Sequence, residues 1–411
     1  MDQEASTMRP LLAGFICLLT ACLPMLAQDD SHLGETHDWF LLREHAAERG
    51  VSSLCKGLVA ASFENRPAAE RELRIVLRKM PHSDSSYVAR GALVKMYFRD
   101  GQYRKALRQA DHAIAERPAA EDMKAVHSVL SKLAQFPDLA IAGSRPATLR
   151  SEVIDGNLFI PVTANGVAGS YLVDSGANIS IMSESEARRL GLKVAETASK
   201  MADISGTATI MRITEVKDLL IGRTHLKHVA FAIYPDANQP FVDLPEAHKG
   251  VLGISVLLAL RSFRMGKGNC FDILPGPAPA SAKVLPLAFD GMLPVAQMGL
   301  AGKKLCYTLD TGANVTVLGP VFAAAYPELM GSGIRQEHKL TGLAGSTPQE
   351  SLKLPSLRFL LGNEVRLAPA TVLLKTTMTA SEWAAGNLGF DLIAQTLPMI
   401  IDFRAMQLTV N

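Results

Sequence analysis

Apolar residues recur at helical spacing through the first third of the chain, from about residue 36 to residue 138. The clearest stretch is 87–118, in which Gly101 interrupts one predicted helix and Pro118 ends the next. The residues that would line the buried faces of this pair are Leu93, Met96, Tyr97, Ala106, Ala110 and Ala113. The pattern predicts a short helical array.

The pattern of residue types changes after 142–146, where glycine, arginine and proline interrupt the helical spacing. Beyond this break, runs rich in Val, Ile, Leu, Thr and Phe, such as Leu158–Thr163, alternate with Gly, Asn and Asp turns. Such alternation is typical of β-hairpins. A proline-rich linker, 275–282, divides this part almost equally. We therefore expect two β-rich units, 148–274 and 283–411.

An apolar run near the start, Leu11–Ala27, follows Arg9 and ends at an acidic flank. Its 17 residues are few for a spanning helix and fit the core of a cleaved export signal covering 1–27. Cleavage at the end of this run would release a periplasmic or secreted protein. Alternatively, the Leu-Thr-Ala-Cys sequence that ends at Cys22 resembles a bacterial lipobox, which would leave a lipid anchor on that cysteine.

Composition narrows the range of functions. The chain has 411 residues, of which 48% are hydrophobic and 20% charged, enough for two or three packed domains. A net charge of +2 does not indicate a nucleic-acid partner. Three cysteines, Cys55, Cys270 and Cys306, lie beyond the apolar run without the spacing of zinc ligands. We expect no metal, no cofactor and no required disulfide.

The helical segment 87–118 resembles a tetratricopeptide repeat. The matching residues are Leu93, Tyr97, Gly101, Tyr103, Ala106, Ala113 and Pro118, whereas Arg90 stands where the family has a tryptophan. The resemblance implies that the domain 36–138 offers a surface for a protein partner. The alternative is that these helices only pack against the rest of the chain.

Two similar segments occur in the two β-rich units. They read YLVDSGANIS at 171–180 and YTLDTGANVT at 307–316. Each is followed by a second motif, GVLGI at 250–254 and GNLGF at 386–390. In both units 79 positions separate the aspartate from the last glycine of the second motif. Equal spacing of two motifs indicates a duplicated structural unit.

These paired motifs resemble those of the pepsin and retropepsin superfamily of aspartic peptidases, over roughly 148–411. The resemblance implies an α+β multidomain protein, in which a helical, tetratricopeptide-like array precedes a bilobal all-β aspartic-peptidase fold. It also implies that Asp174 and Asp310 form a catalytic pair between the lobes. Ala177 and Ala313 follow the retropepsin pattern, since pepsins carry Ser or Thr there.

The resemblance also assigns supporting residues. Hydroxyls beside the aspartates are expected to link the lobes, and glycines to allow close backbone approach. The residues with these structural roles are Ser175, Gly176, Gly253, Thr311, Gly312 and Gly389. Asn178 and Asn314 fall where retropepsins contact the substrate backbone. Candidate flaps at 202–208 and 341–346 add Gly206 and Gly345 as expected substrate contacts.

Two carboxyl groups in contact cannot easily both ionise, so the pair is expected to share a proton, as in known aspartic proteases. The ionised member would take a proton from a water that attacks the peptide carbonyl, and the protonated member would donate to the carbonyl oxygen. Sequence leaves open which aspartate is the base. Because Ala177 and Ala313 offer no hydroxyl donor, we expect poorly stabilised carboxylates and a mildly acidic optimum.

The sequence therefore predicts an exported aspartic endopeptidase that acts on a peptide or protein substrate. The main alternative is an inactive protein of the same fold that binds peptides or proteins. A further alternative is self-processing, with the helices as a removable pro-region. Because one chain carries both aspartates, 148–411 is expected to be active as a monomer, with the helices dispensable for cleavage of a short peptide.

Overall fold

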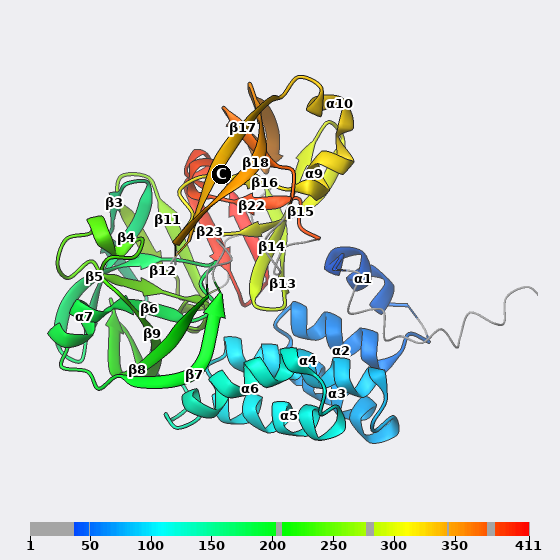
Figure 1. Ribbon diagram of the computed structural model, residues 1–411, viewed down its shortest axis with the longest axis vertical. Coiled ribbons are helices and arrows are strands. Elements are labelled where there is room, and N and C mark those ends of the chain that lie inside the picture. Colours follow the sequence, from blue (N-terminus) through cyan, green and yellow to red (C-terminus); the bar gives the residue numbers. More distant parts are fainter. Residues whose placement is uncertain are drawn as a thin grey trace, which may run out of the picture.

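The computed structural model describes residues 37–48, 50–202, 208–276, 283–342, 345–375 and 383–410. The predicted signal 1–27, with Cys22, lies outside the described residues, as does most of the linker 275–282. In the described part, six N-terminal helices precede two β-rich lobes. In the view of Figure 1 the first helix, α1 (Trp39–Ala46), lies to the right of the second lobe, and the other helices lie lower in the picture. The predicted α+β architecture, a helical array followed by a bilobal aspartic-peptidase fold, is confirmed.

The helices form where the apolar pattern predicts them. They are α1 (Trp39–Ala46), α2 (Ser53–Ser62), α3 (Arg66–Lys79), α4 (Asp84–Arg99), α5 (Tyr103–Glu116) and α6 (Glu121–Leu133). Side-chain oxygens of Ser52, Asn65 and Ser83 accept backbone N–H groups in the first turns of α2, α3 and α4. Gly101, with φ of +67°, makes the predicted break between α4 and α5.

The β-rich part divides into lobe 1 and lobe 2. Lobe 1 contains β1 (Ala140–Gly143), β2 (Ala147–Arg150), β3 (Glu152–Ile154), β4 (Asn157–Ala164), β5 (Val167–Val173), β6 (Ser180–Ser183), α7 (Glu184–Arg189), β7 (Ala195–Ala202), β8 (Ala208–Ile221), β9 (Thr224–Tyr234), β10 (Gly250–Leu252), α8 (Ile254–Leu260), β11 (Ser262–Gly266) and β12 (Cys270–Ile273). Lobe 2 contains β13 (Val284–Asp290), β14 (Leu293–Leu300), β15 (Lys303–Leu309), β16 (Val317–Leu318), α9 (Pro320–Ala325), α10 (Pro327–Met330), β17 (Ile334–Gly342), β18 (Gly345–Leu354), β19 (Leu357–Leu361), β20 (Asn363–Leu367), β21 (Ala370–Leu373), β22 (Gly386–Leu388), α11 (Phe390–Ile393), β23 (Met399–Asp402) and β24 (Gln407–Val410).

The two lobes repeat one arrangement around the sequence motifs. In lobe 1, β5 lies parallel to β10, with Leu172 opposite Val251. In lobe 2, β15 lies parallel to β22, with Thr308 opposite Asn387. The second pair is displaced from the first by 136 positions, the same offset that relates Ser175 to Thr311. Each copy of the sequence motifs therefore forms the same pair of parallel strands.

One sheet connects the lobes. Its strands run β13, β24, β23, β11, β12 and β2, so that strands of lobe 1 continue those of lobe 2. Phe263 of β11 lies opposite Ile401 of β23 in this sheet. The predicted linker 275–282 falls between β12 and β13, but backbone hydrogen bonds also join the lobes. Their relative position is therefore held by more than the linker.

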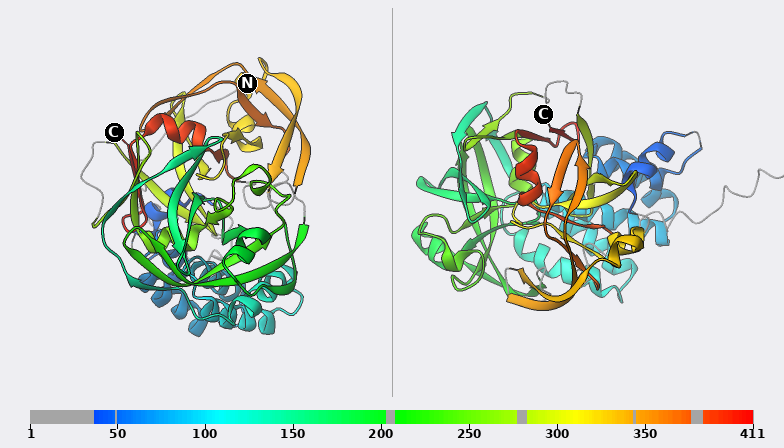
Figure 2. Two further views of the ribbon diagram at one scale, coloured as in Figure 1. Left: turned by 90° about the vertical axis from the view of Figure 1, so that its left-hand side faces the viewer. Right: turned by 90° about the horizontal axis from the view of Figure 1, so that it is seen from above.

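The helical array packs on both lobes, as the views in Figure 2 show. Helix α4 contacts α8 of lobe 1, whose seven residues are all buried. Helices α1 and α2 contact β13 of lobe 2. The apolar core of the helices is continuous with residues of the lobes such as Phe159, Val251 and Ala288. The helices thus cover apolar surface that the lobes would otherwise expose.

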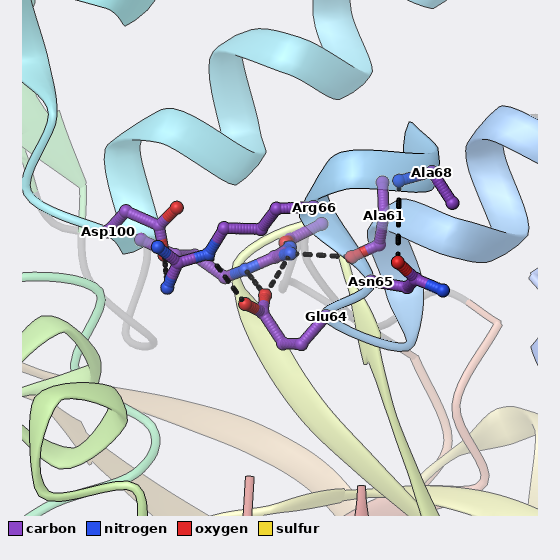
Figure 3. A network of polar contacts seen from close by, with 8 residues as sticks. Ala61, Glu64, Asn65, Arg66, Ala68 and Asp100 are labelled. Atoms are coloured by element: carbon purple, nitrogen blue, oxygen red, sulfur yellow. Dashed lines mark hydrogen bonds and ion pairs between the residues drawn. The ribbon is translucent and has the colours of Figure 1, made fainter. Parts of the chain in front are cut away.

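A buried ionic cluster connects the helices to lobe 2. Arg99, at the end of α4, donates to Glu64 Oε1 at 2.7 Å and to the carbonyl of Gly291, in the turn after β13. Arg66 pairs with Asp100 Oδ1 at 2.6 Å, and Figure 3 shows both beside Glu64. Burial, and then the Glu64 charge, raise the pKa of Asp100 to about 7 despite the opposing arginines.

Candidate active site

Each motif aspartate follows a buried strand and is held by its backbone. Asp174 comes directly after β5, and its N–H donates to the carbonyl of Leu252 at 3.1 Å. Asp310 comes directly after β15, and its N–H donates to the carbonyl of Leu388 at 3.0 Å. The parallel strands β10 and β22 thus fix the point at which each aspartate leaves its strand.

Backbone donors orient both carboxyl groups in the same way. Asp174 Oδ1 accepts the N–H groups of Gly176 and Ala177 at 2.8 and 3.1 Å. Asp310 Oδ1 accepts those of Gly312 and Ala313, both at 3.0 Å. Donation to a carboxylate oxygen favours the ionised form and leaves little freedom for rotation of the side chain.

Gly176 and Gly312 bring the two carboxyl groups together. A Cβ atom on Gly176 would lie 2.6 Å from Asp310 Cγ, and one on Gly312 would overlap Asp174 Cγ still more closely. Gly176 belongs to the loop of Asp174 but touches Asp310, and Gly312 belongs to the loop of Asp310 but touches Asp174. Each carboxyl group therefore rests against the catalytic loop of the other lobe. No side chain fits at either glycine without displacing the partner's carboxyl group.

Ser175 and Thr311 connect the two loops, as the sequence predicts. Ser175 Oγ donates to the carbonyl of Leu309 at 2.7 Å, and Thr311 Oγ1 donates to that of Val173 at 2.8 Å. Each hydroxyl also accepts the backbone N–H of the other residue. Both side chains are fully buried. These four bonds hold the two aspartates at a fixed separation.

Gly253 and Gly389 lie against the catalytic loops. A Cβ atom at Gly253 would lie 2.6 Å from the Ile179 carbonyl carbon, and one at Gly389 would lie 2.6 Å from that of Val315. Two hydroxyls that the sequence analysis missed complete this packing. Ser180 Oγ accepts the Gly253 N–H at 3.0 Å, and Thr316 Oγ1 accepts that of Gly389 at 2.9 Å. The two hydroxyl residues occupy the same position in the two motifs, and this could have identified them from the sequence.

The lobes differ at one residue beside the aspartates that sequence reasoning missed. Asn387 Nδ2 donates to Asp310 Oδ2 at 2.8 Å. Asn387 thus supplies Asp310 with a side-chain donor that the expectation based on Ala177 and Ala313 did not include. The available signal was the second position of the GNLG motif, where the first repeat has Val251.

Burial raises the pKa of Asp174 well above its usual range, and the nearby Asp310 carboxyl raises it further. The N–H groups of Gly176 and Ala177 oppose this shift but do not cancel it. A carboxyl group in this position retains its proton at a pH where an ordinary aspartate is ionised. The site can therefore hold an acid and a base in contact.

The expected substrate contacts are less well defined. Asn178 and Asn314 are both exposed beside the catalytic loops. Asn314 Nδ2 lies 3.5 Å from the carbonyl of Asp155, in the turn between β3 and β4 of the opposite lobe. Gly345 begins β18, opposite Gly342 of β17. Gly206 lies outside the described residues.

Among the described residues, no group of three or more His, Cys, Asp or Glu side chains is arranged to hold a metal ion. Likewise, no described helix combines the length and apolar character needed to cross a membrane.

The fold and the paired aspartates define a two-lobed, single-chain protein of the aspartic-peptidase fold. Residues 160–256, which lie in lobe 1, match the family model described as aspartyl protease. This match confirms the resemblance predicted from the motifs. Among curated proteins, none matches the chain.

Several solved structures are similar to parts of the chain. A retropepsin-like aspartic protease from Rickettsia conorii has 18% identity and a TM-score of 0.23, with 33% of this chain and 90% of that chain covered. Conglutin gamma, a basic 7S globulin from lupine seeds, has 10% identity and a TM-score of 0.39, with 65% and 94% covered. The structure titled edgp has 11% identity and a TM-score of 0.36, with 64% and 94% covered.

Proposed function

We propose that the protein is an aspartic endopeptidase that hydrolyses peptide bonds in peptide or protein substrates. The observation that carries this proposal is the pairing of Asp174 and Asp310, each held by two backbone N–H donors and joined through Ser175 and Thr311. A protein that only binds peptides would not require two carboxyl groups pressed against each other, because that contact is costly.

In the proposed reaction, the ionised carboxylate accepts a proton from a water molecule, whose oxygen attacks the carbonyl carbon of the scissile bond. The protonated carboxyl group donates its proton to the carbonyl oxygen, which gives a neutral tetrahedral intermediate. As the intermediate collapses and the C–N bond breaks, the carboxyl group that took the proton from water gives it to the leaving amine, and a hydroxyl group of the intermediate gives its proton to the other carboxylate. One acid and one base, both returned to their starting forms, account for every proton.

Cleavage of a peptide library by the purified protein, with products identified by mass spectrometry, tests this function. We expect internal cleavage that stops when a peptide with a hydroxyl group in place of the scissile carbonyl is added, because that group mimics the tetrahedral intermediate. If no peptide is cleaved between about pH 3 and about pH 8, over which a carboxyl pair could titrate, the alternative of a peptide-binding protein is favoured.

Export is a separate part of the proposal, supported by the apolar run Leu11–Ala27. The mature chain would begin at Gln28 or at a lipid-modified Cys22, in the periplasm, on a membrane or outside the cell. Intact mass of the native protein distinguishes these two starts, and a chain that retains residues 1–27 in the cytoplasm would contradict both. Any protein partner of the helices would bind the faces that the lobes leave uncovered.

A further inference from the structure

We infer that Asn387 is a positioning residue that makes the aspartate pair asymmetric. Its amide holds Asp310 as the ionised base and leaves Asp174 as the member that carries the shared proton. This inference rests on the proposed peptidase function and assigns the two chemical roles that the motifs alone leave open.

The Asn387 amide bridges Asp310 and Thr308. Its Nδ2 donates to Asp310 Oδ2 at 2.8 Å, and its Oδ1 accepts from Thr308 Oγ1 at 2.5 Å. Thr308 is buried and lies directly opposite Asn387, on the strand that leads into Asp310. The Thr308 hydroxyl also lies 3.3 Å from the Gly386 carbonyl. In this arrangement the hydroxyl donates to the amide oxygen, and the amide nitrogen faces the carboxylate.

The equivalent position in lobe 1 offers no such donor. Val251 corresponds to Asn387, and Leu172 corresponds to Thr308, at the same register of parallel strands. Both lobe 1 residues are apolar and buried. A polar pair thus replaces an apolar pair next to Asp310, although the surrounding loops keep the same backbone hydrogen bonds.

This difference sets where the shared proton lies. Among the described residues, Asp310 accepts three N–H groups, from Gly312, Ala313 and Asn387, whereas Asp174 accepts two, from Gly176 and Ala177. N–H donors favour the ionised form of a carboxyl group. Asp174 is the titratable group that faces Asp310, so a proton excluded from one is carried by the other.

The chemistry follows from this assignment. Asp310 takes the proton from the attacking water, and Asp174 gives its proton to the carbonyl oxygen of the scissile bond. Each carboxylate oxygen has two lone pairs, so Asp310 can hold the Asn387 amide and still accept a proton. The raised pKa of Asp174, caused first by its burial and then by Asp310, agrees with its role as the acid.

Titration of the protein with carbon-13 at Asp Cγ tests the inference without relying on turnover. The two signals are assigned with Asp174→Asn and Asp310→Asn and are followed from about pH 3 to about pH 9. We expect Asp310 to ionise first in the native protein. In Asn387→Val, which carries the lobe 1 residue, the first ionisation should move up by about one pH unit and spread over both signals. Asp174 ionising first, or an unchanged titration in Asn387→Val, would overturn the inference.

Activity provides a second readout. The acidic limb of the pH profile of kcat/KM should move to a pH higher by about one unit in Asn387→Val, because the base is then protonated more readily. Thr308→Ser keeps the hydroxyl and should retain the native limb, whereas Thr308→Val should move it in the same direction as Asn387→Val. A lower kcat/KM with the native limb would contradict the positioning role. If the titrations behave as expected but no peptide is cleaved, the effect of Asn387 on the position of the proton holds and the proposed peptidase function fails.

Discussion

Ser175 Oγ accepts the backbone N–H of Thr311 at 3.1 Å, and Thr311 Oγ1 accepts that of Ser175 at 3.0 Å. These reciprocal bonds cross from one lobe to the other directly beside the aspartates. They are fully buried, so water cannot replace either hydroxyl once it is removed.

Ser175→Ala should therefore lower the free energy of unfolding by about 1–3 kcal/mol, since a buried N–H and the Leu309 carbonyl lose their partner. Urea unfolding measures the change. Ser332→Ala is a suitable control, because its exposed hydroxyl donates only to the nearby Leu329 carbonyl and should cost less than about 0.5 kcal/mol. Equal effects of the two substitutions would contradict the role of the Ser175 bonds.

The pKa of Asp174 predicts a pH-dependent stability. Because this pKa is raised in the folded state, the folded protein binds the proton more tightly than the unfolded chain. The contribution of Asp174 to stability should therefore be fully present below the pKa of an unfolded aspartate, about 4, and be lost as pH rises through the folded pKa.

Asp174→Asn should remove this dependence, since Asn keeps an oxygen for the Gly176 and Ala177 N–H groups but cannot ionise. The variant should be more stable than the native protein at pH 7, and the difference should shrink toward pH 4. Urea midpoints at both pH values measure it. A variant that is less stable than the native protein at pH 7 would argue against the raised pKa.

The local part of the site was predictable from sequence, and the non-local part was not. The loops around Asp174 and Asp310 form from consecutive residues, and their duplication identified the glycines and hydroxyls together. Asn387 lies 77 positions from Asp310, and its place in the GNLG motif does not by itself show that its amide reaches that carboxyl group. The pairing of β11 with β23 across the lobes also joins residues too distant for periodicity to relate.

The sequence left packing of the helices on the rest of the chain as an alternative but did not identify the residues that make the contact, because Arg99 and Glu64 resemble ordinary surface charges until the fold buries them. Both side chains are at most 6% exposed, and Arg99 also donates to the Gly291 carbonyl of lobe 2. Removing Arg99 would leave the buried Glu64 carboxylate with only Arg66, whose Nε lies 3.4 Å from Glu64 Oε2, and would leave the Gly291 carbonyl without this donor.

Arg99→Ala should lower the free energy of unfolding by about 3–5 kcal/mol. Arg74→Ala is a matched control, since Arg74 pairs with Glu70 on the exposed face of α3 and should cost less than about 1 kcal/mol. Chemical unfolding of both variants gives the comparison. A loss as small for Arg99→Ala as for Arg74→Ala would show that the cluster does not hold the helices on lobe 2.

The sequence predicts that the lobes work without the helices, whereas the packing of the helices predicts that the lobes need them to stay folded. Helix α8 is buried along its whole length and contacts α4, so a chain that starts at residue 139 would expose apolar residues of α8. This shortened chain should aggregate or unfold at lower urea than the full chain. Size-exclusion chromatography and circular dichroism decide the matter, and a monomeric, folded product of native stability would restore the view that the helices are dispensable.

The central claim is that Asp174 and Asp310 act as one catalytic unit. The most direct test is kcat/KM for a cleaved peptide in Asp174→Asn, Asp310→Asn and the double variant. Each single substitution should lower kcat/KM by about 10³-fold or more, and the second should add little, because residues that act together are not additive. Native turnover in either single variant, with the fold intact, would contradict the account.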